Sequence, residues 1–299
     1  MPNPGGTSGE VDHGIVLPQW EFGADAGSIV AYAVAAEAAG WDGVFLADHL
    51  VFPPADELKD APDTPGYEGF ADPWITLAAI AAETERIRLV SWVTPLPRRQ
   101  PWQLARNLAT LDRLSDGRVT LGTGLGRGTD YVPFGRSYDL PELGRRYDEA
   151  LDVMEGLWRG EPFSYDGDHF TLEEATVLPT PVQEPRIPIV VGGLWPHRKP
   201  IQRGARWDGI VPHYPGDGIH PDDPDEATPE EEVRSLLEYY RECTDEPGEV
   251  FLPADPPHAP DDWIDRCANL GATWLYTTNR DPSGEWKVDI ETIRAGPPA

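Results

Sequence analysis

Asp48 and His49 are the strongest candidates for acid–base chemistry in this sequence. Imidazole titrates near neutral pH, so a histidine can donate or accept a proton in a catalytic step. The pair ends the apolar run 43–47, which predicts a β-strand that delivers both side chains at its end. A lone histidine is more often structural, but this position favours a catalytic or cofactor-contacting role.

Gly192 and Gly193 form a second candidate, for binding a phosphate group. They end a predicted strand, and a predicted helix begins near Pro200. Backbone N–H groups and a helix N-terminus could therefore face an anion. A Gly-Gly pair alone is a weak signal, and a plain turn is the alternative. The neighbouring cations Arg198 and Lys199 favour the phosphate interpretation.

The glycine-rich run 122–128 predicts that a ligand approaches the backbone closely. It is not a dinucleotide-binding fingerprint, because no long helix follows it and it does not stand at a Rossmann first turn. We expect its glycines, among them Gly124 and Gly126, to let a flat ring lie against the chain.

The other histidines and four tryptophans give weaker signals. His13 lies at the base of the first predicted strand, where a structural role is expected. His169 lies in a stretch typical of a hairpin with packing aromatics, while His220 and His258 stand in Pro- and Asp-rich loops. The tryptophans that either line an apolar pocket or belong to the core are Trp20, Trp74, Trp92 and Trp102.

The elements that must position these residues alternate between short β-branched runs and amphipathic stretches. The predicted strands are 14–18, 43–47, 88–93, 119–123, 187–191, 208–211, 249–252 and 273–276. The predicted helices are 26–39, 73–84, 101–114, 141–158, 200–205, 230–241, 260–269 and 289–293. Eight strands alternating with helices predict an α/β fold, a single (β/α)8 TIM barrel of roughly 250 residues.

Reactive groups in such a barrel lie where strands end and βα loops begin. This rule adds further strand-end candidates: Gln19, Ser91, Thr94, His213 and Thr277. We expect residues 1–12 to form a disordered arm and residues 13–299 to form one barrel domain with extended βα loops.

The composition narrows the function classes. The net charge is −28, and such a surface disfavours nucleic-acid binding, which needs clustered Lys and Arg. The carboxylates of such a surface repel one another unless salt screens their charges, so the composition favours adaptation to a high-salt cytoplasm. An acidic mesophilic protein is the alternative. The two cysteines lack disulfide or metal-ligand patterning, and no apolar run reaches the ~20 residues of a membrane span. We expect a soluble, cytoplasmic protein without a signal peptide.

Several stretches taken together resemble the luciferase-like monooxygenase superfamily, over roughly residues 14 to 280. The segments that carry the resemblance are 43–49 (GVFLADH), 110–118 (TLDRLSDGR), 121–124 (LGTG), 148–154 (DEALDVM), 188–193 (PIVVGG) and 205–209 (ARWDG).

The resemblance implies an oxidoreductase that binds FMN or the deazaflavin coenzyme F420 at the C-terminal mouth of the barrel and acts on a small organic substrate. The deazaflavin branch ends its second strand with an Asp-His pair, which matches Asp48 and His49 and favours F420. F420 would serve hydride transfer, with His49 managing the proton. FMN would serve monooxygenation and require a separate flavin reductase. Members are commonly homodimers.

The cofactor-binding residues expected on these grounds are Ser91, Trp92, Thr94, Gly124, Arg127, Gly192, Gly193 and Arg198, and no metal ligand is expected. The resemblance also implies a non-prolyl cis peptide bond at Ser91-Trp92, in a bulge after the third strand. One departure stands out. Some deazaflavin members carry a catalytic Glu after the fourth strand, where this chain has Arg127, which could instead hold a cofactor phosphate or an anionic substrate.

Two other classes of protein compete with this interpretation. A metal-dependent hydrolase on the same fold would need a His-x-His pair at the first strand, where this chain has Pro18-Gln19-Trp20. A non-catalytic flavin-binding protein would keep the cofactor residues without needing His49. The substrate depends on the loops 50–70 and 128–140.

Overall fold

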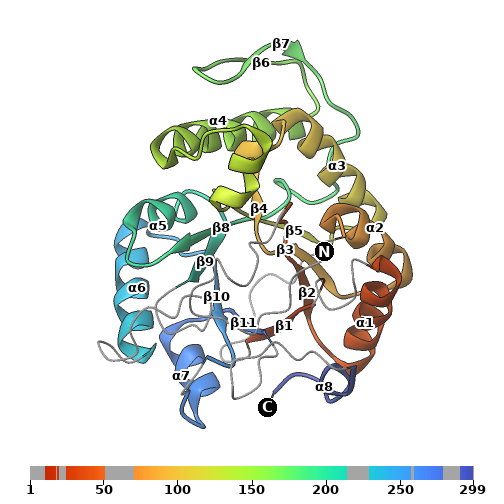
Figure 1. Ribbon diagram of the computed structural model, residues 1–299, viewed down its shortest axis with the longest axis vertical. Helices are drawn as coiled ribbons and strands as arrows, with labels where there is room; N and C mark the ends of the chain where they lie inside the picture. Colours follow the sequence, from red (N-terminus) through yellow and green to blue (C-terminus); the bar gives the residue numbers. More distant parts are fainter. Residues whose placement is uncertain are drawn as a thin grey trace.

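Eight parallel strands close into a barrel in the computed structural model, which describes residues 11–17, 19, 25–50, 71–213, 229–256, 259–278 and 290–298 (Figure 1). The barrel closes because β3 pairs with both β2 and β5. The strands are β1 (Asp12–Val16), β2 (Gly43–Leu46), β3 (Arg88–Ser91) with its continuation β4 (Thr94–Pro95), β5 (Val119–Gly124), β8 (Ile189–Leu194), β9 (Gly209–His213), β10 (Glu249–Pro253) and β11 (Trp274–Thr277). The (β/α)8 fold predicted from the alternation is confirmed.

Helices form the outer ring of the barrel (Figure 1). They are α1 (Ala26–Ala39), α2 (Pro73–Glu83), α3 (Pro101–Leu114), α4 (Leu140–Trp158), α5 (Arg198–Gly204), α6 (Pro229–Cys243), α7 (Trp263–Leu270) and α8 (Ile290–Arg294). The predicted bounds of α1 and α3 agree residue for residue. The largest differences are local: α7 begins three residues later than predicted, and β8 runs on through both glycines to Leu194.

Local capping explains why the first helices begin and end where they do. Asp25 accepts hydrogen bonds from the backbone N–H groups of Gly27 and Ser28 at 3.2 and 3.3 Å, which satisfies donors that the first turn leaves free. Gly40 ends α1 with φ of 91°, a left-handed conformation that glycine adopts without a Cβ clash. Asp72 caps α2 in the same way as Asp25, with Pro73 in the first turn.

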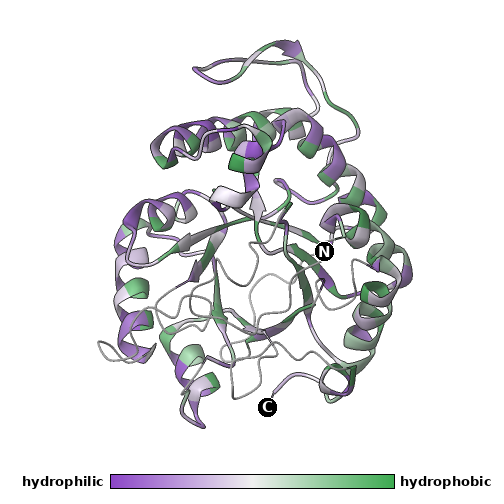
Figure 2. Cartoon of the chain, in the orientation of Figure 1, coloured by the Kyte–Doolittle hydropathy of each residue, from purple (hydrophilic) through white to green (hydrophobic). Residues whose placement is uncertain are grey.

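Aromatic side chains fill the interior of the barrel. The rings of Phe45 and Trp92 stack at 4.8 Å between centroids, and those of Phe251 and Trp274 stack at 5.3 Å. The colouring by hydropathy shows apolar residues on the strands and on many inward helix faces, with hydrophilic residues outside (Figure 2). The interior is therefore a packed core, and ligand chemistry is confined to the ends of the strands.

A hairpin of β6 (Phe163–Asp166) and β7 (Thr171–Ala175) projects beyond α3 and α4, where the sequence around His169 predicts one (Figure 1). The strand β1 begins at Asp12, so the barrel starts one residue before the predicted boundary. Trp20, His220, His258 and most of the loop 50–70 lie outside the described residues. No described helix combines the length and the apolar character that crossing a membrane requires.

Candidate active site at the mouth of the barrel

His49 is held by a carboxylate that comes from a different loop. Its Nδ1 lies 3.1 Å from Oδ2 of Asp130, which belongs to the short 3-10 helix Gly128–Asp130 after β5. The backbone N–H of Leu50 donates to Oδ1 of Asp130 at 3.1 Å, and that of Arg127 donates to Oδ2 at 3.0 Å. One buried side chain thus joins the loops that follow β2 and β5.

The environment keeps Asp130 in its charged form. Its side chain is fully buried, and burial alone would raise the pKa of the carboxyl group. The hydrogen bond and charge of His49, together with the N–H groups of Arg127 and Leu50, outweigh that effect and bring the pKa below its ordinary value. A carboxylate only accepts hydrogen bonds, so Nδ1 of His49 is the donor.

Asp48 has a different environment from its neighbour. Its carboxylate is 2% exposed and forms ion pairs with Arg98 and Arg99, which follow β4. Nη2 of Arg99 lies 2.8 Å from both carboxylate oxygens, and Nη2 of Arg98 also donates to the backbone oxygen of Asp48 at 3.0 Å. Two guanidinium groups therefore compensate the charge of Asp48, which ties the end of β2 to the segment after β4.

The strand β3 bulges between Ser91 and Thr94. The register against β5 shifts by one residue between β3 and β4, so this strand carries one extra residue there. The non-prolyl cis peptide bond joins Trp92 and Val93, one residue later than the resemblance implies. Ser91 Oγ donates to the backbone oxygen of Gly122 at 2.7 Å, which anchors the bulge to β5.

The bulge sets Trp92 at the mouth end of the aromatic core. The Trp92 ring lies 4.5 Å from that of Tyr276 and 6.3 Å from that of His213, both in edge-on geometry. Phe45 stacks on Trp92 from below, and 8% of Trp92 is exposed. Trp92 therefore forms an apolar floor that separates the barrel interior from its mouth.

The glycines predicted to face a ligand make room for protein side chains. A Cβ at Gly124 or Gly192 would meet the methyl groups of Val93 at 3.2 and 3.1 Å. A Cβ at Gly193 would lie 2.0 Å from Cβ of Pro200, in α5. A side chain at 192 or 193 would therefore disturb the packing of the bulge or of α5 against β8.

The two arginines predicted to contact the cofactor have different surroundings. Arg198 opens α5, is exposed, and stacks its guanidinium 4.7 Å from the ring centre of Tyr239 in α6. Arg127 lies at the mouth near Tyr138. Burial raises the pKa of Tyr138, and the positive charge of Arg127 partly offsets that rise. Among the predicted cations, Arg127 is the one beside the His49–Asp130 pair.

Three buried oxygens at strand ends lack a hydrogen-bond partner within the described part of the chain. They are Oε1 of Gln19 after β1, Oγ1 of Thr94 at the start of β4, and Oγ1 of Thr277 at the end of β11. Each side chain is less than a tenth exposed. An unpartnered polar atom costs free energy when buried, so these positions fit the polar edge of a bound ligand.

The sequence pointed to His49, Trp92 and Thr94 but not to Asp130. Asp130 stands six residues beyond the end of β5, outside the strand-end rule that selected the other candidates. The compact run Gly126–Asp130, with its small residues, was the signal that could have indicated a tight turn carrying a carboxylate. Among the described residues, no group of three His, Cys, Asp or Glu side chains is placed to hold a metal ion.

Comparisons with known proteins show which family the chain resembles. The family model described as luciferase-like monooxygenase matches residues 5–220. An F420-dependent glucose-6-phosphate dehydrogenase from Beutenbergia cavernae is 37% identical over 185 residues, which are 61% of this chain and 51% of that protein. This chain therefore spans about half the length of that curated relative.

Two solved structures share the fold. The coenzyme F420-dependent tetrahydromethanopterin reductase from Methanopyrus kandleri has a TM-score of 0.66 at 16% identity and covers 96% of this chain and 97% of its own. The FMN-bound oxygenating constituent of 3,6-diketocamphane monooxygenase from Pseudomonas putida has a TM-score of 0.61 at 20% identity, covering 82% of this chain and 68% of its own. The family model spans well over half of the chain, and this protein belongs to the luciferase-like monooxygenase family.

Proposed function

We propose that this protein is an F420-dependent oxidoreductase that transfers hydride to or from a small organic substrate at the mouth of the barrel. The observation that carries the proposal is the hydrogen bond between His49 and the buried Asp130. It sets a proton-exchanging imidazole at the C-terminal end of the strands, where barrels of this kind do their chemistry. The name of the Beutenbergia relative supports F420 as the cofactor.

The residues at the mouth fit a flat heterocycle with a polar edge. Trp92 would supply an apolar surface beneath the ring, and the oxygens of Gln19, Thr94 and Thr277 would pair with its polar edge. Arg127 would hold an anionic part of the cofactor or substrate. Ser91, Gly124 and Gly192 would act indirectly, because they support the bulge that carries Trp92.

Each mouth residue has a distinct role in this proposal. When bound, the deazaflavin supplies the hydride chemistry, and the barrel supplies position, exclusion of water and charge. Oxidation of a substrate C–H and O–H pair releases a hydride and a proton, and Nε2 of His49 takes the proton. Asp130 stabilises the imidazolium that forms and holds the ring in place. Asp48 acts as a positioning residue through its two ion pairs.

An FMN-dependent monooxygenase is the second candidate, favoured by the FMN-bound structure from Pseudomonas putida. That reaction would need reduced FMN from a separate flavin reductase. For both candidate functions we predict a cytoplasmic homodimer that acts on a small organic substrate. Arg127 stands where some deazaflavin members carry a catalytic Glu, which argues against glucose 6-phosphate as the substrate of this chain.

Replacing His49 by Asn tests the proposed role of the imidazole. We expect the turnover number to fall about 10²- to 10⁴-fold, the usual contribution of a general acid–base group. F420 affinity should change by less than about threefold, because Trp92 and the strand-end oxygens remain. Stopped-flow deazaflavin absorbance would give the rate, and fluorescence quenching would give the affinity.

The matched control is His169→Asn, in the β6–β7 hairpin, where rate and affinity should both stay unchanged. Undiminished turnover in His49→Asn would show that the imidazole does not manage the proton. Retained F420 binding with no turnover of any substrate by the unaltered protein would instead favour a non-catalytic binding protein.

A further inference from the structure

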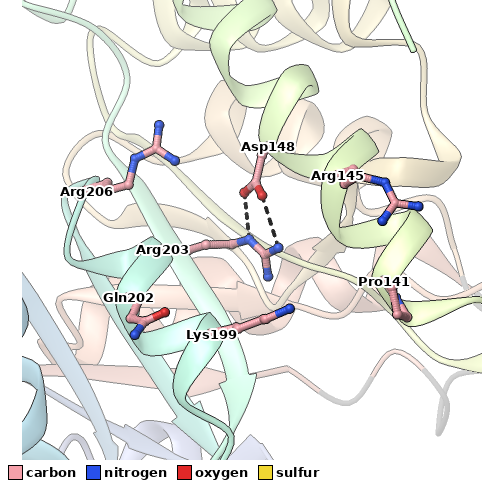
Figure 3. A pocket seen from close by; sticks show the side chains of 7 residues that line it. All are labelled: Pro141, Arg145, Asp148, Lys199, Gln202, Arg203 and Arg206. Carbon is pink, nitrogen blue, oxygen red and sulfur yellow. Dashed lines mark hydrogen bonds and ion pairs between the residues drawn. The ribbon is translucent and has the colours of Figure 1, made fainter. Parts of the chain in front are cut away.

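A row of ion pairs joins α4 to α5 on the outside of the barrel. Arg203 in α5 donates to both carboxylate oxygens of Asp148 in α4, from Nε at 2.6 Å and from Nη2 at 3.1 Å (Figure 3). One turn further along α4, Asp152 lies 3.8 Å from Arg206. Asp148 and Asp152 are four residues apart and share one face of α4. Each of them pairs with an arginine that lies in α5 or just after it.

This pairing of an acid on α4 with an arginine does not continue toward the N-termini of the two helices. Here α4 carries Arg145 and α5 carries Lys199, two cations that line one cavity of about 350 Å³ (Figure 3). Arg145 forms an ion pair with Glu142 of its own helix, and both side chains are half exposed. Lys199 has no ion-pair partner within the described part of the chain. Two like charges facing one space are unfavourable unless an anion lies between them.

The charge of this cavity is opposite to that of the whole molecule. The chain has 52 acidic and 24 basic residues, and only three lysines. Four of the basic residues line this cavity, together with one acid, Asp148, which pairs with Arg203. Arg206 and Arg145 pair with acids outside the lining, Asp152 and Glu142, which leaves Lys199 as the cation without an acid partner in the described part of the chain. A chain of net charge −28 thus carries four cations around one cavity beside α4 and α5.

We propose that this cavity binds the phosphate group of a small phosphorylated molecule. Arginine and lysine are the side chains that recognise phosphate. Gln202 also lines the cavity, and its amide nitrogen donates one of its two N–H groups to the hydroxyl of Tyr239 at 2.7 Å. The volume falls within the range of about 300–1,000 Å³ for small-molecule sites. The cavity is lined by residues of α4 and α5 and by Arg206, which follows α5. None of the residues assigned above to the barrel mouth lines it, so this proposal does not depend on the proposed function.

Calorimetric titration of the full-length protein with phenyl phosphate, at one fixed ionic strength and without flavin, tests the proposal. We expect saturable binding that sulfate and chloride reproduce only weakly. Lys199→Gln and Arg145→Gln should each weaken it about tenfold, the loss expected from one charge-assisted hydrogen bond. Arg294→Gln is the control, because Arg294 is exposed by 60% and has a similar pair with Glu291 three residues away.

A charge reversal distinguishes binding from damage to the fold. Arg145→Glu reverses the charge at this position and loses the exposed ion pair with Glu142, a kind of pair that contributes little to stability. Its melting temperature without phosphate should therefore stay close to that of the unaltered protein while binding is lost. Lys199→Arg should bind within about threefold of the unaltered protein. Absence of saturable binding, or equal affinity in all variants, overturns the proposal. Displacement of phenyl phosphate by FMN with no effect of Lys199→Gln would place the anion at the barrel mouth and overturn it as well.

Discussion

At the scale of single residues, the proposed chemistry rests on the His49–Asp130 pair. His49 follows β2 and Asp130 follows β5, so the contact forms only when the barrel closes. Three hydrogen bonds converge on the Asp130 carboxylate, and they fix both its charge and its orientation. Asp48, adjacent in sequence to His49, has its charge compensated by Arg98 and Arg99 instead. Two neighbouring residues therefore take different roles because their surroundings differ.

Replacing Asp130 by Asn tests its action as a positioning residue. An amide cannot act as the same anionic acceptor, so the His49 ring should no longer be held as the Nδ1–H tautomer. We expect the turnover number to fall at least tenfold, whereas F420 affinity changes little. Nitrogen NMR of labelled histidine would show the tautomer directly, with Nδ1 protonated in the unaltered protein.

Asp25→Asn is the matched control, because Asp25 also accepts backbone N–H groups but caps α1, and Asn is an equally good cap. Asp130→Glu should recover part of the rate because it restores the charge. An unchanged tautomer in Asp130→Asn would contradict the assignment.

The sequence could predict His49 but not the carboxylate that holds it. His49 is visible because an apolar strand ends directly before it, which is a local pattern. Asp130 lies in a short 3-10 turn, and its partner is 81 positions away, so only the closed fold brings them together. The same limit applies to Asp48, since nothing local indicates that Arg98 and Arg99 surround it.

At the scale of elements, the bulge between β3 and β4 determines where Trp92 stands. Its backbone lies against β5 so closely that a Cβ at Gly122 would be 2.0 Å from the backbone oxygen of Ser91. Val93 occupies the space beside Gly124 and Gly192. The strand alternation predicted β3 through Val93, but a bulge depends on the register against β5, which a single strand's sequence does not encode.

Gly122→Ala tests whether the bulge supports the mouth. Backbone cannot yield as a flexible side chain can, so we expect a loss of at least about 1–3 kcal/mol in the free energy of unfolding. Because Trp92 would shift, cofactor affinity should fall at least tenfold in protein that remains folded. Chemical denaturation and fluorescence titration measure the two effects. Gly27→Ala in α1 should leave binding intact and change stability by less than about 1 kcal/mol. Equal behaviour of the two variants would contradict the role of the bulge.

Charge dominates at the scale of the whole molecule. With a net charge of −28, repulsion among carboxylates opposes folding wherever counterions do not screen it. Many of the ion pairs are exposed, such as Arg145–Glu142 and Arg294–Glu291, and pairs of this kind contribute little. We propose that the protein is adapted to high salt. The acid-rich composition indicates this directly, whereas no local motif does.

Salt dependence of unfolding tests that proposal. The screening length falls from about 10 Å at 0.1 M to about 3 Å at 1 M salt, so the melting temperature should rise steadily across this range and beyond. Sodium and potassium chloride should act alike at equal ionic strength if screening is the cause. A melting temperature that stays constant or falls with salt would show that repulsion does not limit stability.

The central claim is that the mouth of this barrel binds a deazaflavin for hydride transfer. Its most direct test is titration of the purified protein with F420 and with FMN in molar salt, followed by fluorescence quenching. We expect saturable F420 binding at least tenfold tighter than FMN binding, and replacing Trp92 with Ala should weaken it. Tight FMN binding with weak F420 binding would contradict the claim in favour of an FMN-dependent monooxygenase, and binding of neither would contradict the cofactor assignment altogether.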